Sequence, residues 1–377
     1  TLFRSQDSMK MTLDGTEEAP DVTFNPADKD DSHKTGFTLK IAKTHHAKKI
    51  VITYQTKLAD WKEGGQQFWG SNSGFNIGNK LTMSANGLPA KAEIKAQYRG
   101  ESRMLEKTVG SYDPETHEIS WTMTVNKNEM PVHDGKIVDT LDSEDWEFVQ
   151  DSVQFSDVSV KKAITFSDTK PQTMTIDLND FDKQITITYK TRLTDEGLKK
   201  LLGNGTQLTV KNSAQLTGKE VADTVKAEVS KTIGWDVLRK TVSFDGGNTA
   251  TWCVDVNRNH AVITAPEGTH SIGISDTLQK GLVYLSDSLK VYQVDFGEGG
   301  NASNKHALTE GTEYKVDYDE TNRTLSITWL NMSKMTKSYQ VEFQTQVLVS
   351  GTYNNTVQFF GVANGTYDSE AGSKTWR

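Results

Sequence analysis

Hydrophobic and polar residues alternate along most of this chain, which is the pattern of a β-strand with one buried face. Ile185, Ile187 and Tyr189 alternate with threonine and lysine residues. Segments 121–125 and 252–256 show the same alternation, each with a tryptophan at its first apolar position. Gly, Thr, Asn, Asp and Ser are abundant, as expected for strands joined by turns. The pattern predicts an all-β fold.

Several of these predicted strands share sequence motifs that recur along the chain. One strand motif occurs three times, as ITYQTKL at 52–58, ITYKTRL at 187–193 and VEFQTQV at 341–347, and a second motif occurs as WTMTVN at 121–126 and WCVDVN at 252–257. Repeats of this length are typical of tandem domains, and alternating strands of this kind pack as two antiparallel sheets. We therefore expect tandem β-sandwich domains, each built from two packed antiparallel sheets.

The repeats predict four segments. Residues 91–219 and 220–366 each hold a complete repeat, residues 1–90 hold the later half of one, and residues 367–377 form a linker or tail. Two explanations account for the half repeat. The chain is a window cut from a longer tandem array, or another copy of the chain supplies the missing strands by strand complementation.

Composition narrows the functional classes. The formal net charge of -8 argues against a nucleic-acid partner. Cys253 is the only cysteine, so no intrachain disulfide can form, and the eight histidines show no metal-ligand spacing. No apolar stretch is long enough for a membrane span, so this segment is not expected to insert into a membrane. We predict no cofactor, no metal and no enzyme acting on a separate substrate.

One set of three polar residues stands out against this background. Lys107 opens a Lys-Thr-Val triplet, Asp139 opens Asp-Thr-Leu 32 residues later, and Asn212 follows after a further 73 residues, before a serine. Each motif alone occurs by chance in many proteins, and lysine and aspartate are normally exposed unless paired. The set gains weight because it occurs twice.

The second set has the same order and similar spacing. Lys240 opens Lys-Thr-Val, Asp276 opens Asp-Thr-Leu 36 residues later, and Asn355 follows after 79 more. Asn354 is adjacent, and strand alternation would point only one of the two inward. Asn79 occupies the corresponding place in the first half repeat, where it is an orphan cross-link residue without its own lysine and aspartate.

An amine, a carboxyl and a carboxamide buried together can form an amide bond between lysine and asparagine. Burial lowers the pKa of lysine and raises that of aspartate, so the pair can exist as a free amine and a neutral acid. The acid can then polarise the carboxamide and move protons as ammonia leaves. This would be a single-turnover self-modification. Asp139 and Asp276 would be the promoting acids.

The ordered motifs resemble the collagen-binding-type, immunoglobulin-like domains of cell-wall-anchored surface adhesins from Gram-positive bacteria. The resemblance rests on the KT, DTL and YKT motifs and on the asparagine before Thr or Ser, and it covers nearly the whole chain. In such domains an intramolecular isopeptide bond joins lysine to asparagine, with the acid as catalyst. The resemblance assigns these roles to Lys107, Asp139 and Asn212, and likewise to Lys240, Asp276 and Asn355.

Three functions fit this resemblance. The leading one is an extracellular structural stalk or adhesin segment of a bacterial surface protein, stabilised by Lys-Asn isopeptide bonds. An alternative is a module that binds a host extracellular-matrix protein such as collagen. Another is a carbohydrate-binding β-sandwich, in which the loop tryptophans Trp61, Trp69 and Trp235 would stack on a glycan.

Overall fold

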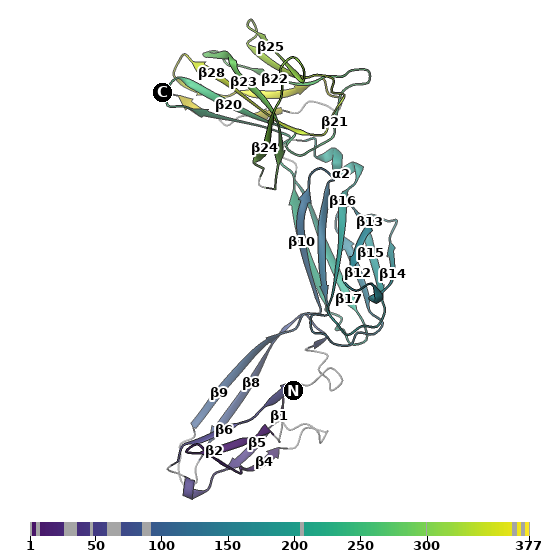
Figure 1. Cartoon of the computed structure of the whole chain (residues 1–377), viewed down its shortest axis with the longest axis vertical. Coiled ribbons are helices and arrows are strands. Elements are labelled where there is room, and N and C mark those ends of the chain that lie inside the picture. Colours follow the sequence, from purple (N-terminus) through teal and green to yellow (C-terminus); the bar gives the residue numbers. More distant parts are fainter. Residues whose placement is uncertain are drawn as a thin grey trace.

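The computed structural model is almost entirely β-structure, as the alternation predicted, and follows an arc of three parts from the N-terminus to the C-terminus (Figure 1). The described residues are 2–4, 8–25, 36–45, 48–58, 69–84, 92–203, 207–298, 300–363, 368–370 and 374–376.

The middle part is a sandwich of two antiparallel sheets. The first sheet has the order β10 (Leu105–Asp113), β11 (Glu118–Val125), β16 (Ile185–Leu193) and β13 (Trp146–Phe155). The second has the order β14 (Lys161–Phe166), β15 (Thr173–Leu178), β12 (Lys136–Leu141), β17 (Leu208–Thr217) and β18 (Lys226–Ile233). A short helix, α2 (Asp195–Lys200), follows β16, and Thr194 caps its N-terminus by accepting a hydrogen bond from the Gly197 N–H.

The C-terminal part repeats this topology. One sheet has the order β19 (Leu238–Phe244), β20 (Thr249–Val256), β28 (Ser338–Val347), β23 (Leu282–Phe296) and β24 (Ala302–Ala307). The other has the order β25 (Tyr314–Asp319), β26 (Thr324–Trp329), β22 (Ile272–Thr277), β30 (Thr356–Phe360) and β31 (Asp368–Glu370). Two small pairs complete it, β21 (Ile263–Thr264) with β27 (Lys334–Met335) and β29 (Gly351–Tyr353) with β32 (Lys374–Trp376).

The N-terminal part contains shorter sheets. They are β1 (Leu2–Arg4) with β7 (Thr56–Leu58); β3 (Thr16–Glu18), β2 (Lys10–Leu13) and β6 (Ile50–Thr53); β4 (Asp21–Asn25) with β5 (Gly36–Lys40); and β8 (Gly74–Met83) with β9 (Ala92–Glu101). The pairing of β2 with β6 corresponds to that of β13 with β16 in the middle sandwich, and β8 with β9 corresponds to β17 with β18.

Strand pairing also bears on the predicted division of the chain. β9 pairs with β8, and β18 pairs with β17, although the division at 90 and 219 assigned β9 and β18 to the following repeats. Alternation within a strand does not specify which sheet the strand joins, and the division at 90 and 219 stays a prediction. The segment 367–377, expected to be a linker or tail, contributes β31 and β32 to the C-terminal part.

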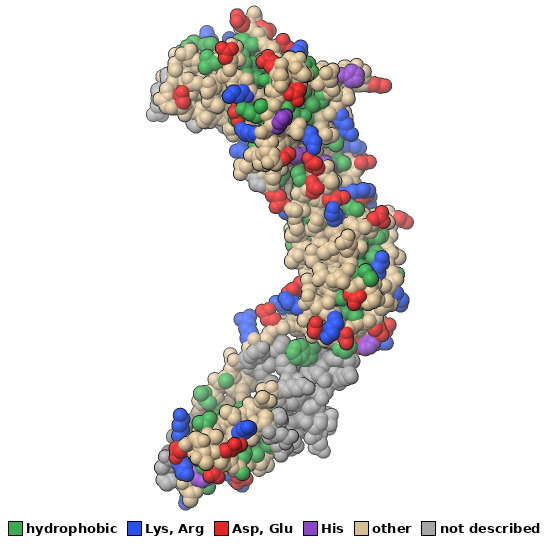
Figure 2. Space-filling view, in the orientation of Figure 1, with side chains coloured by type: hydrophobic (Ala, Val, Ile, Leu, Met, Phe, Trp, Pro, Cys, Tyr) green, Lys and Arg blue, Asp and Glu red, His purple; other side chains and the backbone are tan. Residues whose placement is uncertain are grey.

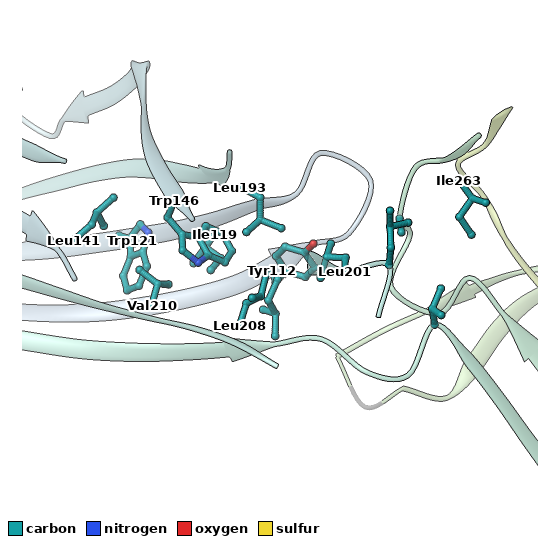
Figure 3. Packing of buried hydrophobic residues seen from close by; sticks show 14 of the residues in the cluster. Tyr112, Ile119, Trp121, Leu141, Trp146, Leu193, Leu201, Leu208, Val210 and Ile263 are labelled. Carbon is teal, nitrogen blue, oxygen red and sulfur yellow. The ribbon is translucent and has the colours of Figure 1, made fainter. Parts of the chain in front are cut away.

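Apolar side chains from facing sheets form the core of both sandwiches. The predicted inward residues are buried: Trp121 and Met123 are fully buried, and Ile187 is as well. Figure 3 shows Trp121 and Trp146 packed in the middle sandwich, close to Val210 from the facing sheet. The alternation therefore predicted correctly which face of each strand is covered.

Polar contacts join the middle and C-terminal sandwiches. The Glu298 Oε1 atom accepts hydrogen bonds from the Tyr112 backbone N–H at 2.9 Å and from Lys231 Nζ at 2.5 Å. Lys337 pairs with Glu115 at 2.6 Å. Tyr112 also contacts the neighbouring His117, with 2.8 Å between its hydroxyl and Nδ1. The joint is therefore held by specific contacts from both sides.

Charged side chains of both signs are interspersed over the visible face of the molecule (Figure 2). Of the helices within the described residues, none has the length and apolar character needed to cross a membrane.

Candidate cross-linking sites

The two predicted lysines face the interiors of their sandwiches. Lys107 lies on β10 and Lys240 on β19, at the edge of the first sheet in each case. They occupy inward positions of alternating strands, so their side chains point toward the second sheet, and the end of each side chain is inaccessible to solvent. Lysine is seldom buried in this way without a partner.

Strand register brings each aspartate next to its asparagine. Asp139 on β12 pairs with Ala214 on β17, two residues beyond Asn212. Asp276 on β22 pairs with Val357 on β30, again two residues beyond the asparagine, which here is Asn355. Side chains in this diagonal relation lie on the same face of a sheet and within reach of each other. All four side chains are buried.

Asn354 and Asn355 have opposite environments. Asn355 is buried, with 2% of its surface exposed, whereas Asn354 faces solvent and its backbone N–H donates to Gln279 Oε1. Alternation along the strand causes this difference. The geometry therefore places Asn355 beside Asp276.

In the middle sandwich the three side chains meet at a fourth, Tyr189. Lys107 Nζ lies 2.5 Å from Asp139 Oδ2 and also contacts the Tyr189 hydroxyl. That hydroxyl donates to Asp139 Oδ2 and accepts from Asn212 Nδ2 at 3.0 Å. Tyr189 lies on β16, directly opposite Trp121. The sequence motifs did not identify it as a site residue.

In the C-terminal sandwich Lys240 and Asp276 form an equally buried ion pair. The position that corresponds to Tyr189 is Phe343 on β28, which pairs with Trp252 as Tyr189 pairs with Trp121. Phenylalanine has no hydroxyl, so the fourth polar group is absent from this site.

Aromatic rings form the walls of both sites. Lys107 Nζ lies 5.8 Å from the Trp121 ring centre and 5.1 Å from that of Tyr189. Lys240 Nζ lies 4.7 Å from the Trp252 ring centre and 5.5 Å from that of Phe343. Such walls exclude water, which strengthens electrostatic effects inside.

Each tryptophan is held by a threonine that the sequence motifs also did not identify. The Trp121 indole N–H donates to Thr191 Oγ1 and the Trp252 N–H to Thr345 Oγ1, both at 2.9 Å. Each threonine lies two residues after the aromatic residue of the repeated strand motif, and this fixed spacing could have identified it.

Burial shifts the ionisation of the paired groups. Desolvation lowers the pKa of Lys107 and raises that of Asp139, while the attraction between the two charges opposes both shifts. Desolvation likewise lowers the pKa of Lys240 to about 8 and raises that of Asp276. Asn355 is near enough to Asp276 to oppose that rise, although the two side chains do not meet hydrogen-bond geometry. Both pairs are shifted toward a free amine and a neutral acid.

Several polar atoms at these sites have no hydrogen-bond partner among the described residues. They are Asp139 Oδ1, Asn212 Oδ1, Asp276 Oδ1 and both polar side-chain atoms of Asn355. Buried polar atoms in native proteins nearly always have partners, and an unpaired one costs about 1–3 kcal/mol. Both sites therefore contain buried polar groups that are available for further bonding.

Asn79, the orphan of the N-terminal part, also contacts a tyrosine. Its Nδ2 atom donates to the Tyr54 hydroxyl at 2.5 Å. Tyr54 occupies the same position in the first copy of the strand motif as Tyr189 does in the second. An asparagine–tyrosine contact is therefore present in two of the three parts.

Within the described ranges, no three His, Cys, Asp or Glu side chains are grouped so that they could hold a metal ion. Cys253 carries a free thiol whose pKa is raised to about 12, chiefly by burial. A thiol with so high a pKa is a poor nucleophile at neutral pH.

No curated protein matches the chain. Among solved structures, the C-terminal domain of the Streptococcus agalactiae AgI/II polypeptide BspA matches with 14% identity and a TM-score of 0.31, covering 71% of this chain and 99% of that one. The collagen adhesin CNA of S. aureus matches with 13% identity and a TM-score of 0.26, covering 72% and 93%. The collagen binding subdomain of the Enterococcus faecalis surface protein ACE matches with 15% identity and a TM-score of 0.28, covering 37% and 98%. At TM-scores this low the similarity assigns neither a ligand nor an activity to this chain.

The family comparison gives a more specific result for the middle sandwich. Residues 102–227 match the collagen binding domain family. The match begins just before β10 and ends within β18, so it includes Lys107, Asp139 and Asn212. The resemblance indicated by the motifs is confirmed, because residues 102–227 match the collagen binding domain family.

Proposed function

We propose that this chain is a load-bearing segment of a bacterial surface adhesin, in which isopeptide bonds join Lys107 to Asn212 and Lys240 to Asn355. The observation that carries the proposal is the repetition of one geometry. In both sandwiches a buried lysine of the first sheet faces an aspartate and an asparagine in the same diagonal register on the second. The family match of residues 102–227 supports the adhesin assignment.

The reaction replaces one amide by another. The lone pair of the free Lys107 amine forms a bond to the Asn212 side-chain carbonyl carbon, and the bond from that carbon to Nδ2 breaks. The amine loses one proton, the leaving nitrogen gains one, and ammonia departs. Asp139 begins and ends as a neutral acid and exchanges protons in between. The second site would react in the same way through Lys240, Asp276 and Asn355. The protein turns over no external substrate.

Each bond would join the two sheets of a sandwich, and it would link residues near the N-terminal and C-terminal ends of that sandwich. Lys107 lies on the first strand of the middle sandwich and Asn212 on the last but one. A force applied along the chain would pass directly between these strands through the new bond. Residues 108–211 would then bear none of it. This arrangement suits an extracellular protein that projects from a cell and has no intrachain disulfide.

The cross-links can be tested by digesting the purified chain with trypsin and sequencing the products by mass spectrometry. The proposal predicts two branched peptides, one joining Lys107 to Asn212 and the other joining Lys240 to Asn355. Recovery of the four segments only as separate linear peptides would contradict it.

Collagen binding is the second candidate, because the family that matches residues 102–227 is described as a collagen binding domain. The full chain should be applied to immobilised collagen, with a glycan array as a parallel test of carbohydrate binding. Of the three tryptophans predicted to stack on a glycan, Trp61 lies outside the described residues. Trp69 and Trp235 are both partly buried, and Trp69 packs against the hydrophobic core. Saturable binding to collagen would add a ligand to the stalk, and binding to glycans alone would favour the carbohydrate alternative.

A further inference from the structure

Tyr189 occupies the centre of the first site. Its hydroxyl is the one group that contacts the lysine amine, the aspartate carboxyl and the asparagine carboxamide together. Its side chain is 2% exposed, and it lies on β16, between the strands that carry Trp121 and Trp146. The tyrosine is therefore fixed in a position from which it touches every reacting group.

The three parts of the chain differ at this position. Tyr54 contacts Asn79 in the N-terminal part, as Tyr189 contacts Asn212 in the middle sandwich. Phe343 replaces the tyrosine in the C-terminal sandwich, and there both polar side-chain atoms of Asn355 lack a hydrogen-bond partner. The hydroxyl therefore correlates with an anchored carboxamide.

We propose that Tyr189 is a catalytic residue of the first cross-link, orienting the Asn212 carboxamide and delivering the proton that its leaving nitrogen requires. The second site works without this group, so its cross-link forms more slowly. This inference rests on the proposed function, since it concerns the rate of the same reaction.

The proton balance assigns one step to each group. As the Lys107 nitrogen bonds to the Asn212 carbonyl carbon, that carbon becomes tetrahedral and Nδ2 becomes able to accept a proton. The hydrogen bond that Nδ2 donates to the Tyr189 hydroxyl then reverses, so the hydroxyl proton moves to Nδ2 across 3.0 Å while Asp139 gives its own proton to the tyrosine. The surplus proton of the lysine nitrogen passes to the resulting Asp139 carboxylate, whose Oδ2 lies 2.5 Å away. The carbon–nitrogen bonding pair leaves with Nδ2 as ammonia. Asp139 and Tyr189 end in the protonation states in which they began.

The environment keeps the tyrosine in its donating form. Desolvation is the main cause that raises the pKa of Tyr189 well above its usual value, and any negative charge on Asp139 raises it further. The hydroxyl is therefore protonated at neutral pH, where it can serve as a donor in the reaction.

The test uses the full chain, recovered unfolded and not cross-linked, and refolded by dilution. Samples are quenched in acid at intervals, and the branched peptides of the two sites are quantified separately by mass spectrometry. Tyr189→Phe should slow the first cross-link by roughly a hundredfold, the lower limit of what a positioned proton donor typically contributes. The second cross-link of the same molecule is the internal control and should keep its rate.

The reciprocal variant guards against a loss caused by faulty folding. Phe343→Tyr places a hydroxyl beside the unpaired atoms of Asn355 and should accelerate the second cross-link, leaving the first unchanged. Parental rates at the first site in Tyr189→Phe would overturn the inference even if both cross-links form. Absence of both cross-links from the parent would instead overturn the proposed function, so the two failures are distinguishable.

Discussion

Asp139 lies diagonally opposite Asn212 across β12 and β17, with both side chains on the inner face of one sheet. Lys107 reaches them from the facing sheet, so a bond between lysine and asparagine would tie the sheets together. The C-terminal sandwich contains a copy of this arrangement, formed by Lys240, Asp276 and Asn355.

Loss of the first cross-link should destabilise the middle sandwich. Asp139→Asn removes the acid while keeping nearly the same shape, so Lys107 and Asn212 should stay unjoined. A cross-link that closes a loop on the order of 100 residues contributes about 4–5 kcal/mol on the chain-entropy model developed for disulfides. The unfolding midpoint of the middle sandwich should fall by roughly 10–20 °C in calorimetry. Asp151→Asn, the same change at an exposed position of β13, is the control and should unfold like the parent.

Mechanical extension should be limited in the cross-linked chain. With Lys107 joined to Asn212, residues 108–211 cannot be pulled out, whereas their release would add roughly 350 Å of extended chain. Single-molecule pulling on the parent should therefore lack a step of this length, and the Asp139→Asn variant should gain it. The same long step in both proteins would argue against a load-bearing bond.

The two adjacent asparagines of the second site should behave differently. Asn355→Ala should abolish the loss of ammonia from the C-terminal sandwich, because the buried carboxamide is the one beside Asp276. Asn354→Ala changes an exposed side chain and should leave the cross-link intact. Peptide mapping of both variants decides between them, and the opposite pattern would show that the register is wrong.

Acid should lower the stability of the middle sandwich through His117, which lies at the end of the sandwich that contacts the C-terminal sandwich. Burial lowers the pKa of His117 to about 4, from an ordinary value of 6.5. Its folded pKa is depressed, so His117 is neutral in the folded protein and protonated in the unfolded chain between these values. Its contribution, on the order of 1–3 kcal/mol, is complete above pH 6.5 and is lost as the pH falls toward 4.

The measurement for this effect is the free energy of unfolding in urea as a function of pH. His117→Asn keeps a residue type that tolerates the positive φ of 58° at this position, and it should flatten the curve between pH 4 and 6.5. An equally steep curve in the variant would place the acid sensitivity elsewhere.

Much of the architecture could be predicted from the sequence, because strand alternation reports directly which side chains are buried. Ile185, Ile187 and Tyr189 were expected on one face, and all three are buried. The sheet membership of β9 and β18 was not predictable, because alternation does not encode the partner of a strand.

The candidate sites show the same division. The repeated motifs named both lysines, both aspartates and both asparagines, and the structure brings the members of each set together in a buried site. They did not identify Tyr189, whose role depends on three contacts made across two sheets. The sequence predicted only that this tyrosine is an inward-facing residue of a repeated strand motif. Only the three-dimensional arrangement distinguishes such a residue from ordinary core.

The most direct test of the account is the intact mass of the purified chain compared with the mass calculated from its sequence. Two cross-links predict a deficit of two ammonia molecules. Asp139→Asn and Asp276→Asn should each restore one, after correction for the substitution itself. A parent chain with its full calculated mass would contradict the account, and Lys107 and Lys240 would then be only buried ion-pair partners.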